Sequence, residues 1–579
     1  MNKKSLFWLI AMLLVFSVFL VACNSKEESS EPASDVNKEE DKGTETAPPA
    51  EDDKKGGTLV YAIDAPPEGL FNYSFYGIAT DAEVISFFDE GLIKYDENLS
   101  PQPNIASWET EDNKKFKFTF KQGVKFHNGD ELTVNDWVFT LKTLASPDYD
   151  GPRYSAVQDI EGAPAFREGK ATEISGINII NDYEIEITFD KARVNNLTNL
   201  WTYVMPSKAF ADVPVAEMSA HELVRTKPIG LGAFKVNKIV PGESVEFVRN
   251  EDYWNGEVNL DKVILRVVDN TSVVGALQNG DVQMISLQPV TAPEVEKLDN
   301  IEIKTAPGLS YYYVGFKLGK FDNNKLAITE ENPKYQSKQL RQAMMYAINR
   351  QEWVDAFFFG YGKPVSKPVP SAHWISADES ELNTYDYDPE KAKALLDEAG
   401  YVDVDGDGKR EDPKGEKFVV KFSHYATGNP TFEARAKALT QYWEEVGLAA
   451  EVEMTDVNLY YDLIEKDDPS IETFFGGWST GADPDPSATQ KSDQIWNYTR
   501  YNNPETDKLL TDALDVEIVG TDTEKRKQLY VEWQKVMNEE VPMLYIAELE
   551  EILAVSKTVG GVTIDVSGTN PPAEWYLNK

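Results

Sequence analysis

The sequence is almost without cysteine and histidine. Its 579 residues include one cysteine and four histidines, so no internal disulfide can form and there is little scope for a soft-ligand metal cluster. Basic residues are also few: 57 Lys and Arg stand against 98 Asp and Glu, a net charge of −41. A chain of that charge repels polyphosphate, which excludes nucleic acid as a partner.

The common signatures of catalysis are missing as well. There is no Walker A sequence, and His221-Glu222 lacks the second histidine of H-E-x-x-H. Residues 477–481 match G-x-S-x-G, which taken literally makes the protein a surface serine hydrolase using Ser479. That motif requires a histidine downstream of the serine, whereas the last histidine is His424. We therefore expect no catalytic residues and no enzyme activity.

The remaining composition is that of a large acidic globular protein. Apolar residues make up 41% of the chain, with 12 Trp, 27 Tyr and 27 Phe, enough for extensive hydrophobic cores and too many for wholesale disorder. At roughly 150 residues per domain, the length predicts about three or four domains.

A single long apolar run lies at the N-terminus. It extends from Ser5 to Ala22 after Lys3 and Lys4, which predicts an export signal at 1–22. The alternative is an uncleaved transmembrane helix, since about 18 apolar residues can just span a bilayer. That alternative leaves the position of the only cysteine unexplained, because Cys23 directly follows the run.

The end of this run, Leu20-Val21-Ala22-Cys23, resembles the lipobox of bacterial lipoproteins. The resemblance implies a diacylglyceryl group on the sulfur of Cys23 and cleavage of the chain before it; two acyl chains, such as palmitate, on one residue are enough for stable membrane anchoring. Residues 24–55 hold eleven acidic and five basic residues and almost nothing apolar, so 23–55 is predicted to be an acidic, disordered tether. A lipid anchor and tether predict the extracellular face of the cell membrane, in a Gram-positive bacterium as first choice.

From Gly56 onward, strand-like and helix-like stretches alternate, which predicts α/β lobes. The rings of Phe116, Phe118 and Phe120 share one face by their period of two, and we expect a hairpin over 116–126. Apolar residues at helical spacing predict helices over 340–348, 389–399 and 432–446.

Two acidic segments attract attention. The first places Asp403, Asp405 and Asp407 in a D-x-D-x-D-G pattern, whose alternate oxygens can converge on a structural calcium ion. Lys414 at position 12 excludes a complete EF-hand, and Glu411 or Asp412 could supply a later oxygen. The alternative is a plain acidic, Gly-rich turn, and we expect no other cofactor.

The second acidic segment, 481–486, reads Gly-Ala-Asp-Pro-Asp-Pro and follows Trp478. Prolines, carboxylates and aromatics together indicate a ligand-facing loop, although a Pro-rich surface turn has the same composition. The candidate ligand-binding residues are Trp478, Gly481, Asp483, Asp485, Asn497, Tyr498 and Tyr501.

Many short motifs, in order along the chain, resemble the oligopeptide- and dipeptide-binding family of ABC-transporter solute-binding proteins. They cover nearly all of residues 56–579, and the segment from Trp478 to Tyr501 is most similar to the Gram-positive oligopeptide-binding branch. The motifs start at Gly56-Gly57-Thr58-Leu59, Phe118-Thr119-Phe120, Thr133-Val134-Asn135-Asp136, Pro228-Ile229-Gly230, Arg249-Asn250-Glu251, Leu340-Arg341-Gln342-Ala343, Tyr387-Asp388-Pro389 and Asn503-Pro504-Glu505.

The resemblance implies a two-lobed, periplasmic-binding-protein-like α/β fold (a Venus flytrap) with an extra subdomain inserted in the first lobe. Mapped onto this chain, lobe I comprises 56–90, 226–307 and 546–579, the inserted subdomain 91–225, and lobe II 308–545.

The resemblance also implies that a monomer captures oligopeptides between its lobes and delivers them to the permease subunits of an ABC importer. In that family an aspartate after the cleft-loop tryptophan pairs with the peptide's α-ammonium. Here the third residue after Trp478 is Gly481, so that role falls to Asp483, our first choice, or to Asp485. The same fold also binds peptide pheromones, nickel and oligosaccharides, which are the alternative ligands.

Overall fold

The computed structural model describes residues 54–578, except 427, 428, 430 and 521. All of them belong to one compact unit, Pro49–Lys579. The expectations for the signal peptide, for Cys23 and for the tether up to residue 53 lie outside the described residues. Within the described part, no helix combines the length and the hydropathy needed to cross a membrane.

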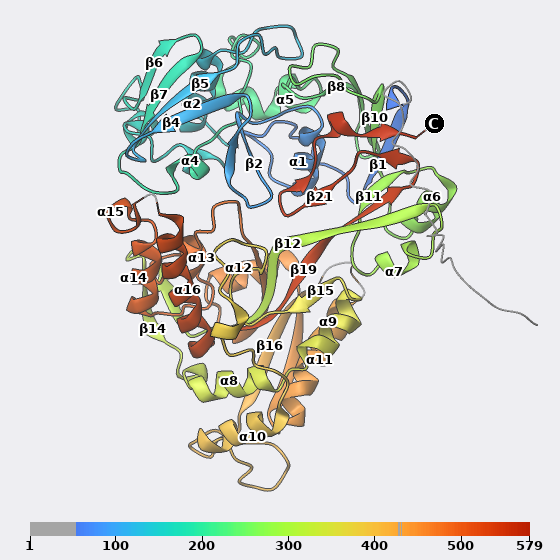
Figure 1. Ribbon diagram of the computed structural model, residues 1–579. Coiled ribbons are helices and arrows are strands. Elements are labelled where there is room, and N and C mark those ends of the chain that lie inside the picture. The colour runs from blue at the N-terminus through green and yellow to red at the C-terminus, as the bar shows by residue number, and fades with distance from the viewer. Residues whose placement is uncertain (1–53, 427–428, 430, 521, 579) are drawn as a thin grey trace, which may run out of the picture. The chain divides into compact units, whose positions relative to one another are not determined.

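The main sheet has eleven strands, and two long ones lie at its middle (Figure 1). The strand order is β17-β16-β18-β12-β19-β11-β1-β10-β9-β8, with β15 beside β19. Because β12 and β19 pair antiparallel along most of their length, they join two groups of strands. The bounds are β1 Thr58–Ile63, β8 Phe234–Val240, β9 Ser244–Arg249, β10 Lys262–Val267, β11 Met284–Ser286, β12 Ile301–Phe316, β15 Gly362–Pro364, β16 Val419–Ala426, β17 Ala449–Asp456, β18 Thr473–Ser479 and β19 Met543–Ser556.

A separate four-stranded sheet, in the order β4-β5-β7-β6, lies within the segment predicted to be the inserted subdomain. Its strands are β4 Ala106–Thr110, β5 Lys115–Phe120, β6 Ile177–Asn181 and β7 Glu184–Thr188. Phe116, Phe118 and Phe120 are buried on one face as expected, and Trp137 of α2 packs edge-on against Phe118 at 4.9 Å between ring centroids.

The predicted hairpin over 116–126 is wrong. β5 pairs with β4 and β7, while residues 124–126 form no strand beside it. β7 begins 64 residues after the end of β5 and brings Ile185 and Ile187 opposite the phenylalanines. A long-range partner with a matching apolar face therefore replaces the local one.

Three predicted helices are confirmed as α8, α10 and α11. Pro389 starts α10 in the first turn, and the side chain of Asp388 accepts a hydrogen bond from the N–H of Lys391 at 2.9 Å, a typical N-cap. The helices are α1 Ala79–Ser86, α2 Val134–Ala145, α3 Ala163–Arg167, α4 Asn196–Asn199, α5 Glu222–Arg225, α6 Val273–Asn279, α7 Ala292–Val295, α8 Lys338–Tyr346, α9 Arg350–Phe358, α10 Pro389–Glu398, α11 Phe432–Glu445, α12 Val457–Glu465, α13 Ser487–Gln490, α14 Pro504–Asp512, α15 Val516–Val519 and α16 Thr523–Glu540.

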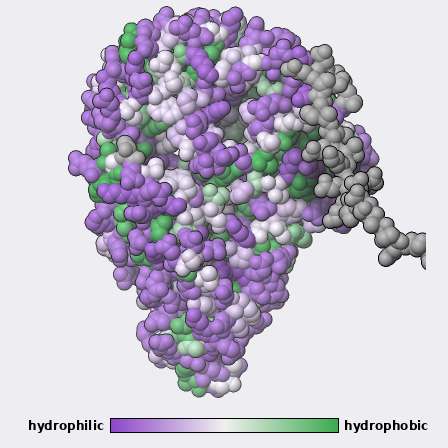
Figure 2. All heavy atoms as spheres, viewed as in Figure 1, coloured by the Kyte–Doolittle hydropathy of each residue, from purple (hydrophilic) through white to green (hydrophobic). Residues whose placement is uncertain are grey.

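Short two-stranded ribbons complete the fold. They are β2 Ile93–Tyr95 with β3 Pro101–Pro103, β13 Gly319–Asp322 with β14 Ala327–Glu331, β20 Val559–Gly560 with β23 Tyr576–Leu577, and β21 Ile564–Asp565 with β22 Gly568–Thr569. The face of the molecule in Figure 2 is mostly hydrophilic, with small scattered apolar patches. The apolar residues are instead concentrated in cores around the sheets, as expected for stable α/β packing.

Candidate functional site

The predicted ligand loop begins where β18 ends. Ser479, the last residue of β18, pairs with Ser310 of β12, and the N–H of Thr480 donates to the carbonyl of Leu309 at 2.9 Å. The indole of Trp478 stacks on the ring of Tyr498, with centroids 5.5 Å apart and an interplanar angle of 26°. Its Nε1 is buried and finds no hydrogen-bond acceptor among the described residues. The loop is thus attached to the central strands of the main sheet.

Asp483 is held by a distant arginine. Its two carboxylate oxygens accept from the Nη1 and Nη2 atoms of Arg526 on α16, at 3.1 and 3.0 Å. Both side chains are buried, at 9% exposure for Arg526 and 10% for Asp483. Burial lowers the pKa of the Arg526 guanidinium. The negative charge of Asp483 raises this pKa by more, so it lies above its usual value. This bidentate geometry is that of a strong, charge-assisted pair.

Asp483 also connects two predicted parts of the chain. The hydroxyl of Thr198, on α4 of the predicted inserted subdomain, donates to its Oδ2 at 3.1 Å. A second link is the isolated β-bridge between Arg193 and Asp515. Segments separated by about 300 residues therefore meet at this loop.

Asp485 has a different environment. Its Oδ1 accepts from the N–H and the hydroxyl of Ser487, at 3.1 and 2.6 Å, and no basic side chain of the described residues lies within 4.0 Å of its carboxylate. Burial and the nearby charge of Asp483 raise its pKa above the usual value of 3.8, and the bonds from Ser487 and the charge of Arg526 offset this only in part. A carboxylate in that state gains from a cationic partner.

A cavity of about 900 Å³ lies beside Asp485. One wall comes from Lys114, Lys191 and Arg193, and the other from residues of the 485–494 and 511–517 segments. Charges of both signs line it, and its volume is within the range of ligand-binding clefts. Of the seven predicted ligand-binding residues, Asp485 alone lines this cavity.

The other candidates stabilise the loop or lie near it. Asn497 is buried, and its Nδ2 donates to the carbonyl of Tyr501 at 2.8 Å. The hydroxyl of Tyr501 accepts from Asn503 at 2.9 Å, and burial raises the pKa of Tyr501 to about 12. Gly481 is exposed, and its carbonyl lies 3.1 Å from Nε2 of His373. Their role in binding a ligand stays a prediction.

Ser479 does not have the surroundings of a nucleophile elbow. It ends a strand and is followed by the 480–486 loop, whereas the elbow needs a sharp strand-to-helix turn. Within the described residues, no hydrogen bond joins Ser479 to a histidine; His373 contacts the carbonyl of Gly481 instead.

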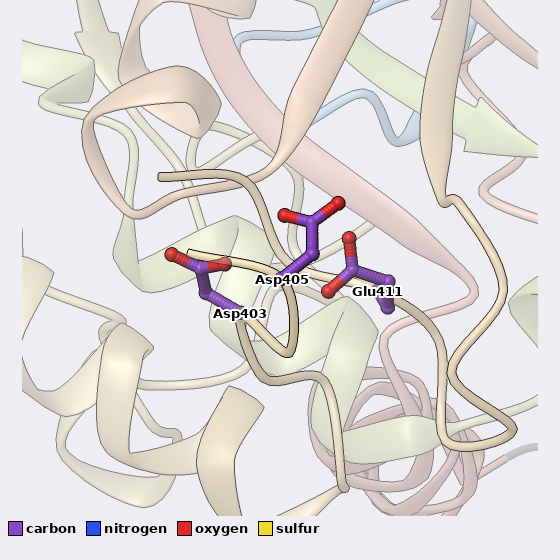
Figure 3. A group of neighbouring side chains, drawn as sticks. All are labelled: Asp403, Asp405 and Glu411. Atoms are coloured by element: carbon purple, nitrogen blue, oxygen red, sulfur yellow. The ribbon is translucent and has the colours of Figure 1, made fainter. Parts of the chain in front are cut away.

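The Asp-rich turn brings together two of the three predicted aspartates, Asp403 and Asp405, with Glu411, one of the two residues expected to supply a later oxygen. Oxygens of Asp403, Asp405 and Glu411 lie within 4.8 Å of one another (Figure 3). Asp407 is outside this group and accepts from the N–H of Lys409 at 2.7 Å. Glu411 is buried, and its Oε2 accepts from the N–H of Val404 at 2.7 Å. Hard oxygen ligands in this arrangement suit calcium, and calcium binding stays a prediction.

The sequence reasoning missed Arg526 and Thr198. Arg526 is 43 residues from Asp483, and Thr198 is 285 residues away. No pattern of nearby residues connects either residue to Asp483. The one indication in the sequence was that a buried carboxylate needs a partner.

Two groups of strands joined by a long strand pair, with a cavity lined by segments far apart in the sequence, form an arrangement that can hold a solute. The model of the bacterial extracellular solute-binding proteins, family 5, matches residues 100–526, and the chain belongs to this family. It is therefore a binding protein and not an enzyme, as predicted.

Relatives and solved structures agree with this family. The chain is 28% identical over 571 residues to the oligopeptide-binding protein AppA of Bacillus subtilis, covering 97% of this chain and 96% of that protein. It is 27% identical over 483 residues to heme-binding protein A of Haemophilus influenzae, covering 79% and 81%.

Among structures, AppA of Bacillus subtilis in complex with a nonapeptide matches with a TM-score of 0.68 at 26% identity, covering 91% of this chain and 100% of that one. Lactococcal OppA, complexed with an endogenous peptide in the closed conformation, matches with a TM-score of 0.75 at 23% identity, covering 90% and 100%. The predicted mixed α/β, periplasmic-binding-protein-like fold is confirmed by these likenesses.

Proposed function

We propose that the protein is the extracellular, lipid-anchored component that captures oligopeptides and delivers them to the permease subunits of an ABC importer. Support comes from the family, whose members are extracellular solute-binding proteins, and from the oligopeptide-binding relative that matches along almost the whole chain. We keep the predicted lobe and subdomain boundaries and the monomeric state as parts of this proposal.

The observation that carries the proposal is the position of Asp485. It lines the 900 Å³ cavity and lacks a basic partner within 4.0 Å among the described residues. A peptide's α-ammonium loses much of its hydration on entering such a site and needs a carboxylate to replace it. Asp483, our first choice from the sequence, already pairs with Arg526, so Asp485 is the anchor that we now propose.

Native mass spectrometry of the purified protein tests the ligand class. Peptides retained from expression are expected, and their masses report length and sequence preference. Retention of heme or a metal complex with no peptides would contradict the proposal. Isothermal titration with a peptide and its N-acetylated form then tests whether a free ammonium group contributes to affinity.

The anchor has its own test, because Cys23 is the only thiol of the chain. Cys23→Ser is expected to move the protein from the detergent phase to the aqueous phase or to leave its signal uncleaved. Detergent partitioning that is unchanged in the mutant would reject lipidation without affecting the peptide-binding proposal.

A further inference from the structure

A second cavity, of about 260 Å³, lies against β1, β10, β9 and β8 at one end of the main sheet, and no residue of the ligand loop lines it. Its floor includes Ile63 and Val267, the last residues of the parallel strands β1 and β10, which are register partners. The β8–β9 hairpin adds Ile239 and Val245, also a register pair. In α/β sheets, ligands bind preferentially in crevices outside the carboxyl ends of parallel strands.

The wall of this cavity is mainly apolar. Ile63, Phe71 and Val245 are each at most 3% exposed and form its inner part. Its volume is slightly below the roughly 300 Å³ at which pockets for drug-sized ligands begin. The cavity therefore suits a small molecule with one or two aliphatic side chains.

Two oppositely charged side chains stand at the same cavity. Arg225, from the end of α5, donates Nε to the carbonyl of Ser219 at 2.9 Å, and Nη1 to the carbonyls of Glu68 and Gly69 at 3.2 and 3.4 Å. Glu68 itself is exposed.

Neither side chain has an ion-pair partner in the part of the chain that the structure describes. Across the described residues, no carboxylate lies within 4.0 Å of the Arg225 guanidinium, and no basic group lies that close to the Glu68 carboxylate. Arg526, by contrast, forms an ion pair with the carboxylate of Asp483 inside the fold. The cavity thus offers one cationic and one anionic group, not paired with each other, above an apolar wall.

We propose that this cavity binds a small apolar zwitterion, either a free aliphatic amino acid or a dipeptide of such residues. The α-carboxylate pairs with Arg225, the α-ammonium with Glu68, and the side chain packs against Phe71, Val245 and Val267. The lining residues fall in 63–71, 225–226, 239–245 and 267, with none from the ligand loop, so the site is additional to the oligopeptide site proposed above.

Isothermal titration of the full-length protein tests this, with leucine, leucyl-leucine, N-acetyl-leucine, leucinamide and aspartate as probes. We expect leucine or leucyl-leucine to bind, and the stronger of the two identifies the source of the zwitterion. N-acetyl-leucine and leucinamide each lack one charge and are expected to bind at least tenfold more weakly. Aspartate, which lacks the apolar side chain, is not expected to bind.

Variants then locate the site. Arg225→Gln is expected to weaken binding of the zwitterion at least tenfold, whereas Lys227→Gln, which removes an exposed charge paired with Glu222, serves as the matched control and is expected to leave it unchanged. Val267→Phe fills the cavity and is expected to abolish binding. Should that variant unfold, Ile239→Phe on the more exposed strand β8 gives the same test.

Three results would overturn the inference. They are no binding of leucine or leucyl-leucine at millimolar concentration, normal binding in folded Val267→Phe or Ile239→Phe, and binding of leucinamide equal to that of leucine. Asp485→Ala separates the two sites: loss of leucine binding in this variant would place leucine in the oligopeptide site instead. Oligopeptide binding measured in all variants reports on the proposed function independently.

Discussion

The two acidic segments, 403–411 and 481–487, look alike in sequence but differ in the structure. In the first, Asp403 and Asp405 are exposed and accept from backbone N–H groups of their own turn, such as Gly408 to Asp403 at 2.9 Å. In the second, Asp483 pairs with Arg526 and contacts Thr198, both far away in sequence. One segment is organised locally, and the other by long-range contacts.

The difference teaches how to interpret a carboxylate in a loop. A local turn gathers carboxylates whose charges are compensated only by solvent or by an ion, so it can respond to calcium. A carboxylate paired with a buried arginine is already compensated, and its removal leaves the arginine uncompensated. Asp485, two residues from Asp483, is half-buried and has no basic side chain within 4.0 Å among the described residues, and is therefore the residue to expect at a ligand.

The largest expected effect follows from breaking the buried pair. Asp483→Ala removes the carboxylate while Arg526 stays buried, and should lower the free energy of unfolding by roughly 3–5 kcal/mol. Urea unfolding followed by tryptophan fluorescence measures it. The control is Asp512→Ala, which breaks the ion pair with the exposed Lys508. It should lower the free energy of unfolding by about 0–1 kcal/mol. Equal losses of unfolding free energy in the two variants would show that the buried Arg526 does not need the carboxylate of Asp483.

Asp485→Ala should act on binding more than on stability. Loss of one partner of a buried charge pair costs roughly 2–5 kcal/mol of affinity for peptides with a free α-ammonium. N-acetylated peptides carry no charge there and should lose far less. Isothermal titration of both peptide forms measures the difference, and equal losses would indicate that Asp485 only supports the loop.

Calcium binding at the Asp-rich turn should raise the stability of the folded state by an intermediate amount. Calcium at 100 times its dissociation constant stabilises the folded state by about 2.7 kcal/mol, so EDTA should lower the melting temperature while peptide affinity stays constant. Asp405→Asn should remove this response, and Asp407→Asn should keep it because Asp407 lies outside the group. No thermal shift with EDTA would make the segment a plain turn.

The smallest effect is a pH dependence from Asp485. Its pKa in the folded protein is raised above 3.8 by burial, so the folded state holds this proton more tightly than the unfolded state. The contribution of Asp485 to the free energy of unfolding therefore falls as the pH rises from about 3.8 through the raised pKa. Peptide affinity changes in the opposite direction, because only the ionised carboxylate pairs with an ammonium group.

Asp485→Asn should flatten the pH dependence of stability and that of peptide affinity. Thermal unfolding and isothermal titration between pH 4 and pH 7 measure the two dependences. Asp483 is unchanged in this variant, so the buried pair with Arg526 is kept. Affinity that rises with pH equally in Asp485→Asn would assign the titration to another group.

Much of the local structure could be predicted from patterns near in sequence. The Asp388-Pro389 start of α10 and the apolar spacing of α8 and α11 are confirmed, because caps and 3.6-residue periodicity act within one helix. The hairpin over 116–126 failed because strand pairing selects a partner by its apolar face, wherever it lies in the chain.

The candidate site could be predicted only in part. The position of the loop after Trp478 and the convergence of Asp403 with Asp405 follow from short spacings. The choice between Asp483 and Asp485 does not, because it depends on Arg526 of α16 and on Thr198 of α4.

The sequence by itself determined the α/β class, the absence of the common catalytic motifs and the family, because composition, periodicity and a long series of motifs are properties of the chain. Only the tertiary structure decided which carboxylate is compensated, which strands pair and where cavities form. These depend on burial and on contacts between residues up to hundreds of positions apart, and a buried charge is stable only beside the partner that folding brings to it.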